Sequence, residues 1–163
     1  MAIVEAVKLL SEQRTDFEMI MVGTGKDVFF TRCLSDNYKL EGRGVIKFTG
    51  EQTPLQVKGW MENSDCFVLF SNYETAGVVL EEAVACGLPI ISTPVGIAEE
   101  VVDYESGVIV PIGDVKKLAD AMSAMIDNNN QYDSNKIRAK ADKYSSDKVG
   151  SQLVEIYKEV IDK

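Results

Sequence analysis

Two glutamates, Glu74 and Glu82, stand eight residues apart around the start of a predicted helix. A buried strand ends just before them, Glu74 lies in the following loop, and Glu82 lies inside the helix. At a rise of about 1.5 Å per helical residue, their separation exceeds the roughly 5–5.5 Å of a retaining glycosidase pair. The spacing favours two hydrogen-bond acceptors for hydroxyls at two points of an extended ligand, although a random pair of this kind is more often two solvated surface carboxylates.

The start of the same helix is a candidate site for an anion. A helix N-terminus carries about half a positive charge and free N–H groups, so it favours a group such as a diphosphate. Small residues at Thr75, Ala76 and Gly77 would let a ligand reach this backbone. We therefore expect the two carboxylates and the helix start to border one ligand cavity.

The phase of the helix separates its two carboxylates. Its apolar residues define one stripe, which runs through Val79, Leu80, Ala83, Cys86 and Gly87. At about 100° per residue, Glu81 lies nearly opposite this stripe and is expected in solvent. Glu82 lies on the flank of the stripe, where a bound ligand would meet it.

A second glycine-rich turn follows the strand predicted over residues 17–22. Its sequence, Gly23-Thr24-Gly25-Lys26, lacks the GxxxxGK[ST] spacing of a phosphate loop and the third glycine of GxGxxG. A flexible strand-to-helix turn is the simpler interpretation. The bare N–H groups of glycine still allow a ligand to approach closely.

Composition excludes several classes of function. The chain has no histidine, which excludes Ser-His-Asp and Cys-His nucleophiles and removes the commonest metal ligand. Its formal net charge of -9 argues against nucleic-acid binding and against adsorption to an anionic membrane. Cys33, Cys66 and Cys86 are odd in number, form no CxxC pair, and are expected to be small buried hydrophobes in a reducing cytosol.

Strands and helices alternate along the chain, and its 163 residues predict a single domain over 1–163. The predicted strands cover 17–22, 45–49, 66–70, 89–93 and 108–110, and the last three are expected to be buried. The predicted helices cover 2–12, 27–40, 54–62, 77–86, 96–103, 114–126 and 149–161, with a polar turn at 128–130. This alternation predicts a Rossmann-like, doubly wound parallel α/β sheet. Ligands bind such sheets at the carboxyl ends of the strands, here loops 23–26, 50–53, 71–77 and 94–97.

The segment FSNYETAGVVLEEAVACGLPI resembles the PSxxEGFGxxxLEAMACGxPV motif of the GT-B retaining glycosyltransferases of family 4, also called glycosyl transferases group 1. The E-x7-E signature of that family falls on Glu74 and Glu82. Upstream, FEMIMVGTG and VIKFTG resemble the family's LxIVGxG and VxFxG, and downstream, STPVGIAEEVVDYESGVIVPIGD resembles ATxxGGxxExVxDGxxGxLVxPxD. The resemblance covers almost the whole chain and points to the C-terminal, donor-binding half of the GT-B fold.

The resemblance implies a role for each site residue. Glu74 would bind the hydroxyls of the donor sugar and is the catalytic candidate, and Glu82 would bind the ribose of the nucleotide. The remaining donor-binding candidates are Thr75, the backbone of Ala76, Gly77, Val78 and Val79, the turn at Gly23, and Gln52 near the nucleobase. GT-B enzymes need no divalent metal, so neither a metal site nor a cofactor is expected.

Three departures from the family pattern stand out. The family's EGFG is Glu74-Thr75-Ala76-Gly77 here, which leaves the donor sugar open, and its GG is Gly96-Ile97. The chain begins inside the first helix, so we expect a fragment that lacks the preceding strand, the Arg/Lys diphosphate clamp and the N-terminal acceptor domain. In the Rossmann order 3-2-1-4-5-6 that strand is central. The gap would be filled by residues outside the sequence, by another chain, or by closure of the two halves.

The function that follows is the donor-binding half of a retaining glycosyltransferase. Its parent enzyme would move a hexose from a UDP- or GDP-sugar to an acceptor in polysaccharide or glycolipid synthesis, and the isolated fragment would be inactive. We expect a cytoplasmic protein whose membrane contact, if any, runs through the missing domain. The alternative is a non-catalytic nucleotide-sugar binding module; a signalling receiver and a sugar epimerase fit the sequence less well.

Overall fold

The computed structural model describes residues 1–25 and 27–161. Strands and helices alternate from α1 to α6, which confirms the predicted α/β class. The strands are β1 Met19–Val22, β2 Ile46–Gly50, β3 Phe67–Leu69, β4 Ile90–Ser92 and β5 Gly107–Ile109. The helices are α1 Ala2–Ser11, α2 Val28–Asn37, α3 Pro54–Glu62, α4 Val78–Cys86, α5 Ala98–Val101, α6 Val115–Asn128, α7 Ser134–Ala139 and α8 Ser146–Ile161, with short 3-10 turns η1 Asn129–Gln131 and η2 Lys140–Tyr144.

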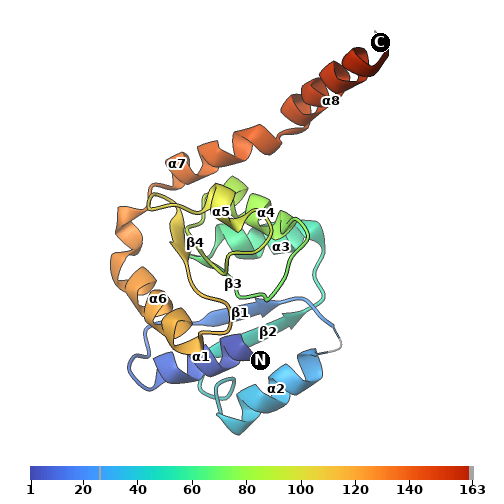
Figure 1. The fold of residues 1–163 in the computed structure, drawn as a ribbon. Helices are drawn as coiled ribbons and strands as arrows, with labels where there is room; N and C mark the ends of the chain where they lie inside the picture. The colour runs from blue at the N-terminus through green and yellow to red at the C-terminus, as the bar shows by residue number, and fades with distance from the viewer. Residues whose placement is uncertain (26, 162–163) are drawn as a thin grey trace.

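All strand pairings are parallel, but the strands form two sheets (Figure 1). One sheet has the order β1-β2 and the other β3-β4-β5, with Met19 beside Ile46 and Phe67 beside Ile90. This matches the Rossmann order on either side of a break between β1 and β3. Closure of the two halves was therefore a wrong expectation. A strand from outside the sequence or from another chain stays a prediction.

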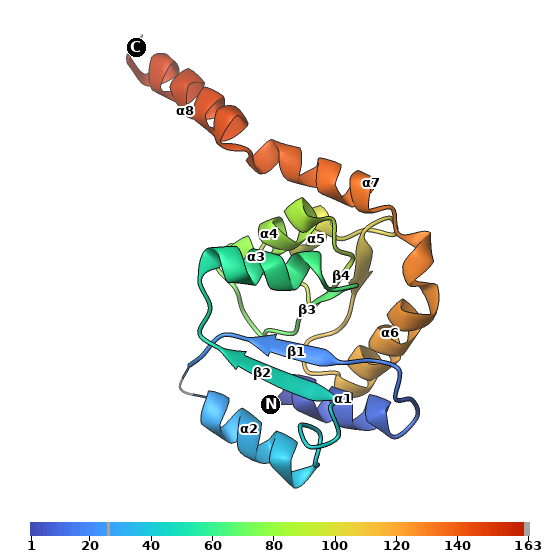
Figure 2. The same cartoon turned by 180° about the vertical axis from the view of Figure 1, so that it is seen from behind.

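Helices cover both faces of the β3-β4-β5 sheet, as expected for a doubly wound fold (Figures 1 and 2). On β4 the two faces alternate with the pleat: Ile91 belongs to a core with α1 and α6, and Ile90 to a core with α3, α4 and α5. Val7 and Leu118 are the fully buried centres of the first core, and Leu80 of the second. The central strand β4 is thus packed on both faces, as expected for a buried strand of a parallel sheet.

The predicted burial of the neighbouring strands is only partly right. Every residue of β4 is buried, whereas all three residues of β3 are half-buried and Val108 of β5 is 37% exposed. In the described residues no strand pairs with the second edge of either β3 or β5. An apolar run therefore identified these strands correctly but overstated how deeply they are covered.

Helix ends follow the local sequence signals. Thr53 accepts a hydrogen bond from the backbone of Gln56 in a capping box, and Pro54 is the first helical residue, as predicted. Asp114 caps α6 by accepting from the Lys117 N–H. Gly87 ends α4 with φ of 77°, a left-handed conformation that favours glycine. The expected polar turn at 128–130 is instead the end of α6 and the turn η1.

Of the two C-terminal helices, α7 packs against the body of the protein and α8 does not. Helix α7 was not predicted from the sequence. Its Ile137 is fully buried, and its Arg138 donates hydrogen bonds to the Ala85 and Cys86 carbonyls at the end of α4. Helix α8 was predicted as an amphipathic closing helix, but none of its residues is buried and it projects away from the body (Figures 1 and 2). Across residues 1–25 and 27–161, every helix falls short of the length and apolarity needed to cross a bilayer.

Candidate functional site

The four loops expected to bind a ligand meet as two pairs at the carboxyl ends of the strands. The first pair lies on the β1-β2 sheet, where the Gly23 N–H donates to the Gly50 carbonyl over 2.9 Å. Gly23 has φ of 115° and Gly50 has φ of 73°, so both positions favour glycine. A Cβ added at Gly23 would meet no described atom within 4 Å, which leaves room beside this turn. Lys26 lies outside the described residues.

The second pair lies on the β3-β4-β5 sheet and is joined more tightly. The Ile97 N–H donates to the Ala76 carbonyl over 2.9 Å, and Thr93 exchanges two hydrogen bonds with the backbone of Ser71. Gly96 packs directly against this loop, because a Cβ at that position would stand 2.3 Å from the Ala76 oxygen. Segment 93–97 therefore supports the loop that carries Glu74, at both of its ends.

Glu74 is a half-buried residue of this supported loop. Its Oε1 accepts a hydrogen bond of 2.8 Å from Ser71 Oγ, which fixes the carboxylate relative to the end of β3. The loop ends at Gly77, whose φ of 79° turns the chain into α4. No side chain among the described residues caps this helix. The Leu80 N–H donates to the Gly77 carbonyl over 2.7 Å, and the N–H groups of Val78 and Val79 remain available to a ligand.

The two carboxylates of α4 are placed the other way round from the sequence prediction. Glu82 is exposed, whereas Glu81 is only half-exposed. The buried face of α4 consists of Leu80, Ala83 and Val84. The sequence prediction placed Val79 and Cys86 in the buried face and left out Val84. The predicted centre of that face is therefore rotated by about 45° around the helix axis from the observed centre. Glu82 therefore points to solvent on the outer side of the helix, where it is free to meet a ligand from outside.

The remaining predicted site residues divide between the two loop pairs. Thr75 and Ala76 are exposed, Gly77 is buried, Val78 is 56% exposed and Val79 is half-buried around the start of α4. Gly23 and Gln52 belong instead to the β1-β2 sheet. In the described part of the chain no hydrogen bond joins one loop pair to the other.

The side-chain amide of Gln52 forms hydrogen bonds with residues around its own loop. Its Nε2 donates to the Thr49 and Glu51 carbonyls over 3.1 and 3.0 Å, and its Oε1 accepts from Trp60 Nε1 over 3.4 Å. Trp60 also lies under the Lys47 ammonium, 4.7 Å from the ring centre, an arrangement that the sequence analysis missed. Gln52 thus shapes the 50–53 turn, and a role in binding the nucleobase stays a prediction.

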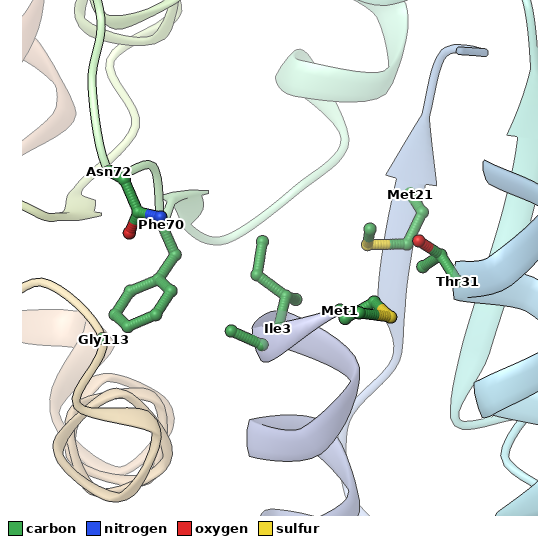
Figure 3. Close-up of a pocket in the computed structure, with 8 residues that line it drawn as sticks. Met1, Ile3, Met21, Thr31, Phe70, Asn72 and Gly113 are labelled. Carbon is green, nitrogen blue, oxygen red and sulfur yellow. The ribbon is translucent and has the colours of Figure 1, made fainter. Parts of the chain in front are cut away.

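A cavity of about 380 Å³ lies between the two halves, at the start of α1 (Figure 3). Phe70 and Asn72 border it from the β3 side, and Met21 from β1. It is lined by Met1, Ala2, Ile3, Met21, Thr31, Phe70, Asn72 and Gly113. Neither Glu74 nor Glu82 lines this cavity, although Asn72 belongs to the loop that carries Glu74. The expectation that both carboxylates border one cavity stays a prediction.

The cysteines and possible metal ligands add little chemistry. Burial raises the pKa of Cys66 to about 12, which makes it an unreactive small hydrophobe as expected. Cys33 is exposed and Cys86 is half-exposed, so the expected burial of all three was wrong. Within 1–25 and 27–161 no group of three or more cysteine, aspartate or glutamate side chains is arranged to hold a metal ion. Metal independence stays a prediction.

A family model described as "Glycosyl transferases group 1" matches residues 2–145. The chain belongs to this family. This confirms the resemblance at the level of group 1 glycosyltransferases, and the assignment to the retaining family 4 stays a prediction. Because the match begins in α1 and ends just after η2, it contains both loop pairs and leaves α8 outside.

Curated relatives agree with this assignment. The chain is 31% identical over 158 residues to N-acetyl-alpha-D-glucosaminyl L-malate synthase of Bacillus anthracis, which covers 94% of this chain and 40% of the relative. It is 32% identical over 130 residues to the lipopolysaccharide core biosynthesis mannosyltransferase LpsB of Rhizobium meliloti, covering 76% of this chain and 36% of LpsB. The chain thus spans about two fifths of the length of these relatives.

Solved structures show the same fold. The sucrose-phosphate synthase of Thermosynechococcus elongatus superposes with a TM-score of 0.84 at 22% identity, over 97% of this chain and 42% of the synthase. TarM of S. aureus, solved with UDP as one of its ligands, superposes with a TM-score of 0.84 at 17% identity, over 96% of this chain and 32% of TarM. The expected Rossmann-like half of a GT-B fold is therefore confirmed.

Proposed function

We propose that this chain is the donor-binding half of a retaining family 4 glycosyltransferase, which moves a hexose from a UDP- or GDP-sugar to an acceptor in polysaccharide or glycolipid synthesis. One observation carries the proposal. In a member of the group 1 family, a fixed carboxylate, Glu74, stands immediately before the uncapped N-terminus of α4. Such an arrangement can bind sugar hydroxyls on one side and a diphosphate on the other.

The proposed roles follow the family motif on which these residues fall. Glu74 binds the donor sugar and is the catalytic residue, the N–H groups from Ala76 to Val79 face the diphosphate, and Glu82 binds the ribose. Gly23, Thr75 and Gln52 complete the donor site. The chemistry is then mostly positioning and electrostatic stabilisation of the leaving diphosphate, and it requires neither a metal nor a cofactor.

The acceptor, in this proposal, binds to a part of the enzyme outside this chain. Support comes from the relatives, of which the chain spans about two fifths, and from the break between β1 and β3, where a further strand and its loop would lie. The purified chain then binds donor but transfers nothing. We place the enzyme in the cytoplasm, with any membrane contact made by the missing part and no role for nucleic acid.

Isothermal titration with UDP, GDP and their hexose derivatives tests the donor site. We expect one nucleotide-sugar to bind, Glu74→Ala to abolish the gain in affinity that the sugar provides, and Glu82→Ala to weaken the nucleotide itself by about 1–3 kcal/mol. Glu81→Ala is the matched control, because it removes a neighbouring carboxylate of the same helix that has no assigned role. Equal losses in Glu81→Ala and Glu82→Ala would contradict the assignment.

Transfer itself is tested in a chimera that joins this chain to the N-terminal part of the Bacillus anthracis relative. We expect the chimera to consume the donor that the titration identifies, and Glu74→Ala to abolish that reaction. A purified chain that transfers sugar to an added acceptor without such a partner would contradict the proposal that the fragment is inactive.

A non-catalytic nucleotide-sugar binding module is the second candidate. It would use the same fixed Glu74 carboxylate and the same N-terminus of α4 to bind the donor, without transferring its sugar. The two candidates predict the same titration and differ in the chimera. A chimera that folds and binds donor with wild-type affinity, yet shows no turnover, supports the binding module.

A further inference from the structure

Thr93 connects two strands where their backbones separate. Its N–H donates to the Leu69 carbonyl over 3.1 Å, which is the last rung between β3 and β4. One residue further along β3, no backbone rung follows in the described structure. The Thr93 side chain replaces it: Oγ1 accepts from the Ser71 N–H over 3.2 Å and donates to the Ser71 carbonyl over 2.7 Å.

The Thr93 side of this exchange is shielded from solvent. Thr93 is fully buried, so its hydroxyl has no water to replace either partner, and a buried polar group without a partner is costly. Both hydrogen bonds go to one residue, Ser71, and they therefore fix its position and orientation together. A valine at position 93 would fill the same space and make neither bond.

Ser71 in turn holds the carboxylate. Its Oγ donates to Glu74 Oε1 over 2.8 Å, while the residues between them, Asn72 and Tyr73, are exposed. The far end of the loop is held separately by the Ile97 N–H on the Ala76 carbonyl. Thr93 thus secures the end of the loop to which the carboxylate is hydrogen-bonded.

We propose that Thr93 is a positioning residue that sets the donor-sugar contact of Glu74 through Ser71. This inference rests on the proposed function, because it takes Glu74 as the residue that meets the sugar. It adds that the hydroxyl of the residue directly after β4, which touches no ligand, controls the affinity for the sugar without changing the affinity for the free nucleotide.

The test compares Thr93→Val, Thr93→Ser and Ser71→Ala in the 163-residue chain. Thr93→Val removes both hydrogen bonds at nearly constant volume, and Thr93→Ser retains the hydroxyl. Ser71→Ala leaves the backbone tether intact and removes only the donor to Glu74. It also provides a test if the buried substitution prevents folding, because Ser71 is only half-buried.

Ser106→Ala is the matched control. The Ser106 hydroxyl is equally buried and also accepts from one backbone N–H and donates to one backbone carbonyl, those of Asp103 over 3.0 Å and Val101 over 2.7 Å, with Asp103 Oδ1 as a second acceptor at 2.9 Å. It belongs to the turn between α5 and β5 and contacts neither Ser71 nor Glu74. An effect that comes only from losing a buried hydroxyl should therefore appear in both Thr93→Val and Ser106→Ala.

Two measurements are made on each variant. Amide hydrogen exchange of residues 71–77 without ligand should accelerate about tenfold in Thr93→Val, and stay unchanged in Thr93→Ser, Ser71→Ala and Ser106→Ala. The ratio of nucleotide to nucleotide-sugar dissociation constants, for the donor identified by titration, should fall about tenfold in Thr93→Val and Ser71→Ala, which corresponds to about 1.4 kcal/mol. The dissociation constant of the free nucleotide should stay within about twofold.

The outcomes separate this inference from the proposed function. Exchange and sugar affinity in Thr93→Val equal to those in Ser106→Ala would overturn the positioning role. Unchanged sugar affinity in Ser71→Ala would overturn the relay to Glu74. If Glu74→Ala removes the sugar increment but Thr93→Val does not, the proposed function holds and the positioning role is wrong. If no nucleotide-sugar binds the wild type, both the proposed function and the donor-contact role of Thr93 are wrong, whatever the exchange rates.

Discussion

The two loop pairs at the carboxyl ends of the strands are held in different ways. On the β1-β2 sheet, Gly23 and Gly50 share one backbone hydrogen bond and have open space beside them. On the β3-β4-β5 sheet, the loop that carries Glu74 is tied at both ends and packed against Gly96. The difference indicates that one half presents an already fixed carboxylate, whereas the other half leaves room for a ligand.

Glycine substitutions should reveal this difference most strongly. Gly96→Ala should lower the free energy of unfolding by about 4 kcal/mol, because φ of 54° strains alanine and its Cβ would stand 2.3 Å from the Ala76 oxygen. Gly23→Ala should lower the free energy of unfolding by only about 1–2 kcal/mol, because alanine is strained by the backbone conformation but meets no neighbouring atom. Urea unfolding of both variants measures the two values. Equal losses would show that the second loop pair is no more tightly packed than the first.

The three-stranded half is also held by α7, and two isoleucines test this. Ile137→Ala should cost about 3 kcal/mol, because the side chain is fully buried against α4 and its neighbours. Ile156→Ala on α8, where the side chain is 54% exposed, should change stability by less than about 0.5 kcal/mol. Thermal unfolding of both variants gives the comparison. A comparable loss at Ile156 would mean that α8 packs against the body in solution.

An ion pair adds a smaller contribution to the same half. The hydrogen bond from the Lys140 ammonium is the main reason that the pKa of Asp103 lies below its ordinary value of 3.8. Hydrogen bonds from Ser106 and from the Glu105 N–H lower this pKa further. A lowered carboxyl pKa stabilises the fold above pH 3.8, and this stabilisation is lost as the pH falls through the lower folded-state value. Lys140→Met should therefore cost less than about 1 kcal/mol at pH 7, because the pair is partly exposed.

The pH dependence separates this effect from lost packing. The melting-temperature difference between wild type and Lys140→Met should be present at neutral pH and shrink as the pH falls below 3.8, where Asp103 becomes protonated in both folded proteins. A difference that stays constant down to pH 2 would assign the effect to the aliphatic part of the lysine side chain.

Much of the framework could be predicted from local sequence. Thr53-Pro54, Asp114 and Gly87 mark helix ends by their own side chains and backbone preferences, and the apolar run at 88–91 identifies β4, whose residues are all buried. Such signals act over a few residues. Helix α7 was missed because Ile137 is its single buried residue, and what covers it is distant in the sequence.

The arrangement of the candidate site was harder to predict. Glu74 and its loop followed from the motif, but Thr93 gave no sign of its contact with Ser71, since a buried threonine in a strand has many possible partners. The orientation of Glu81 and Glu82 depended on whether Val84 or Cys86 faces the core, which tertiary packing decides. The position of the break between β1 and β3 followed from the Rossmann strand order. Whether the break closes, and how exposed α8 is, depend on what packs against these elements, which periodicity does not show.

The central claim is that Glu74 meets the sugar and Glu82 the nucleotide. Side-chain carboxyl signals of glutamate, observed by ¹³C NMR during titration, test it directly. We predict that the free nucleotide shifts the Glu82 signal alone, that the nucleotide-sugar shifts both, and that Glu81 moves with neither. A nucleotide-sugar that binds without moving Glu74, or a free nucleotide that moves Glu74 as far as the sugar does, would contradict the account.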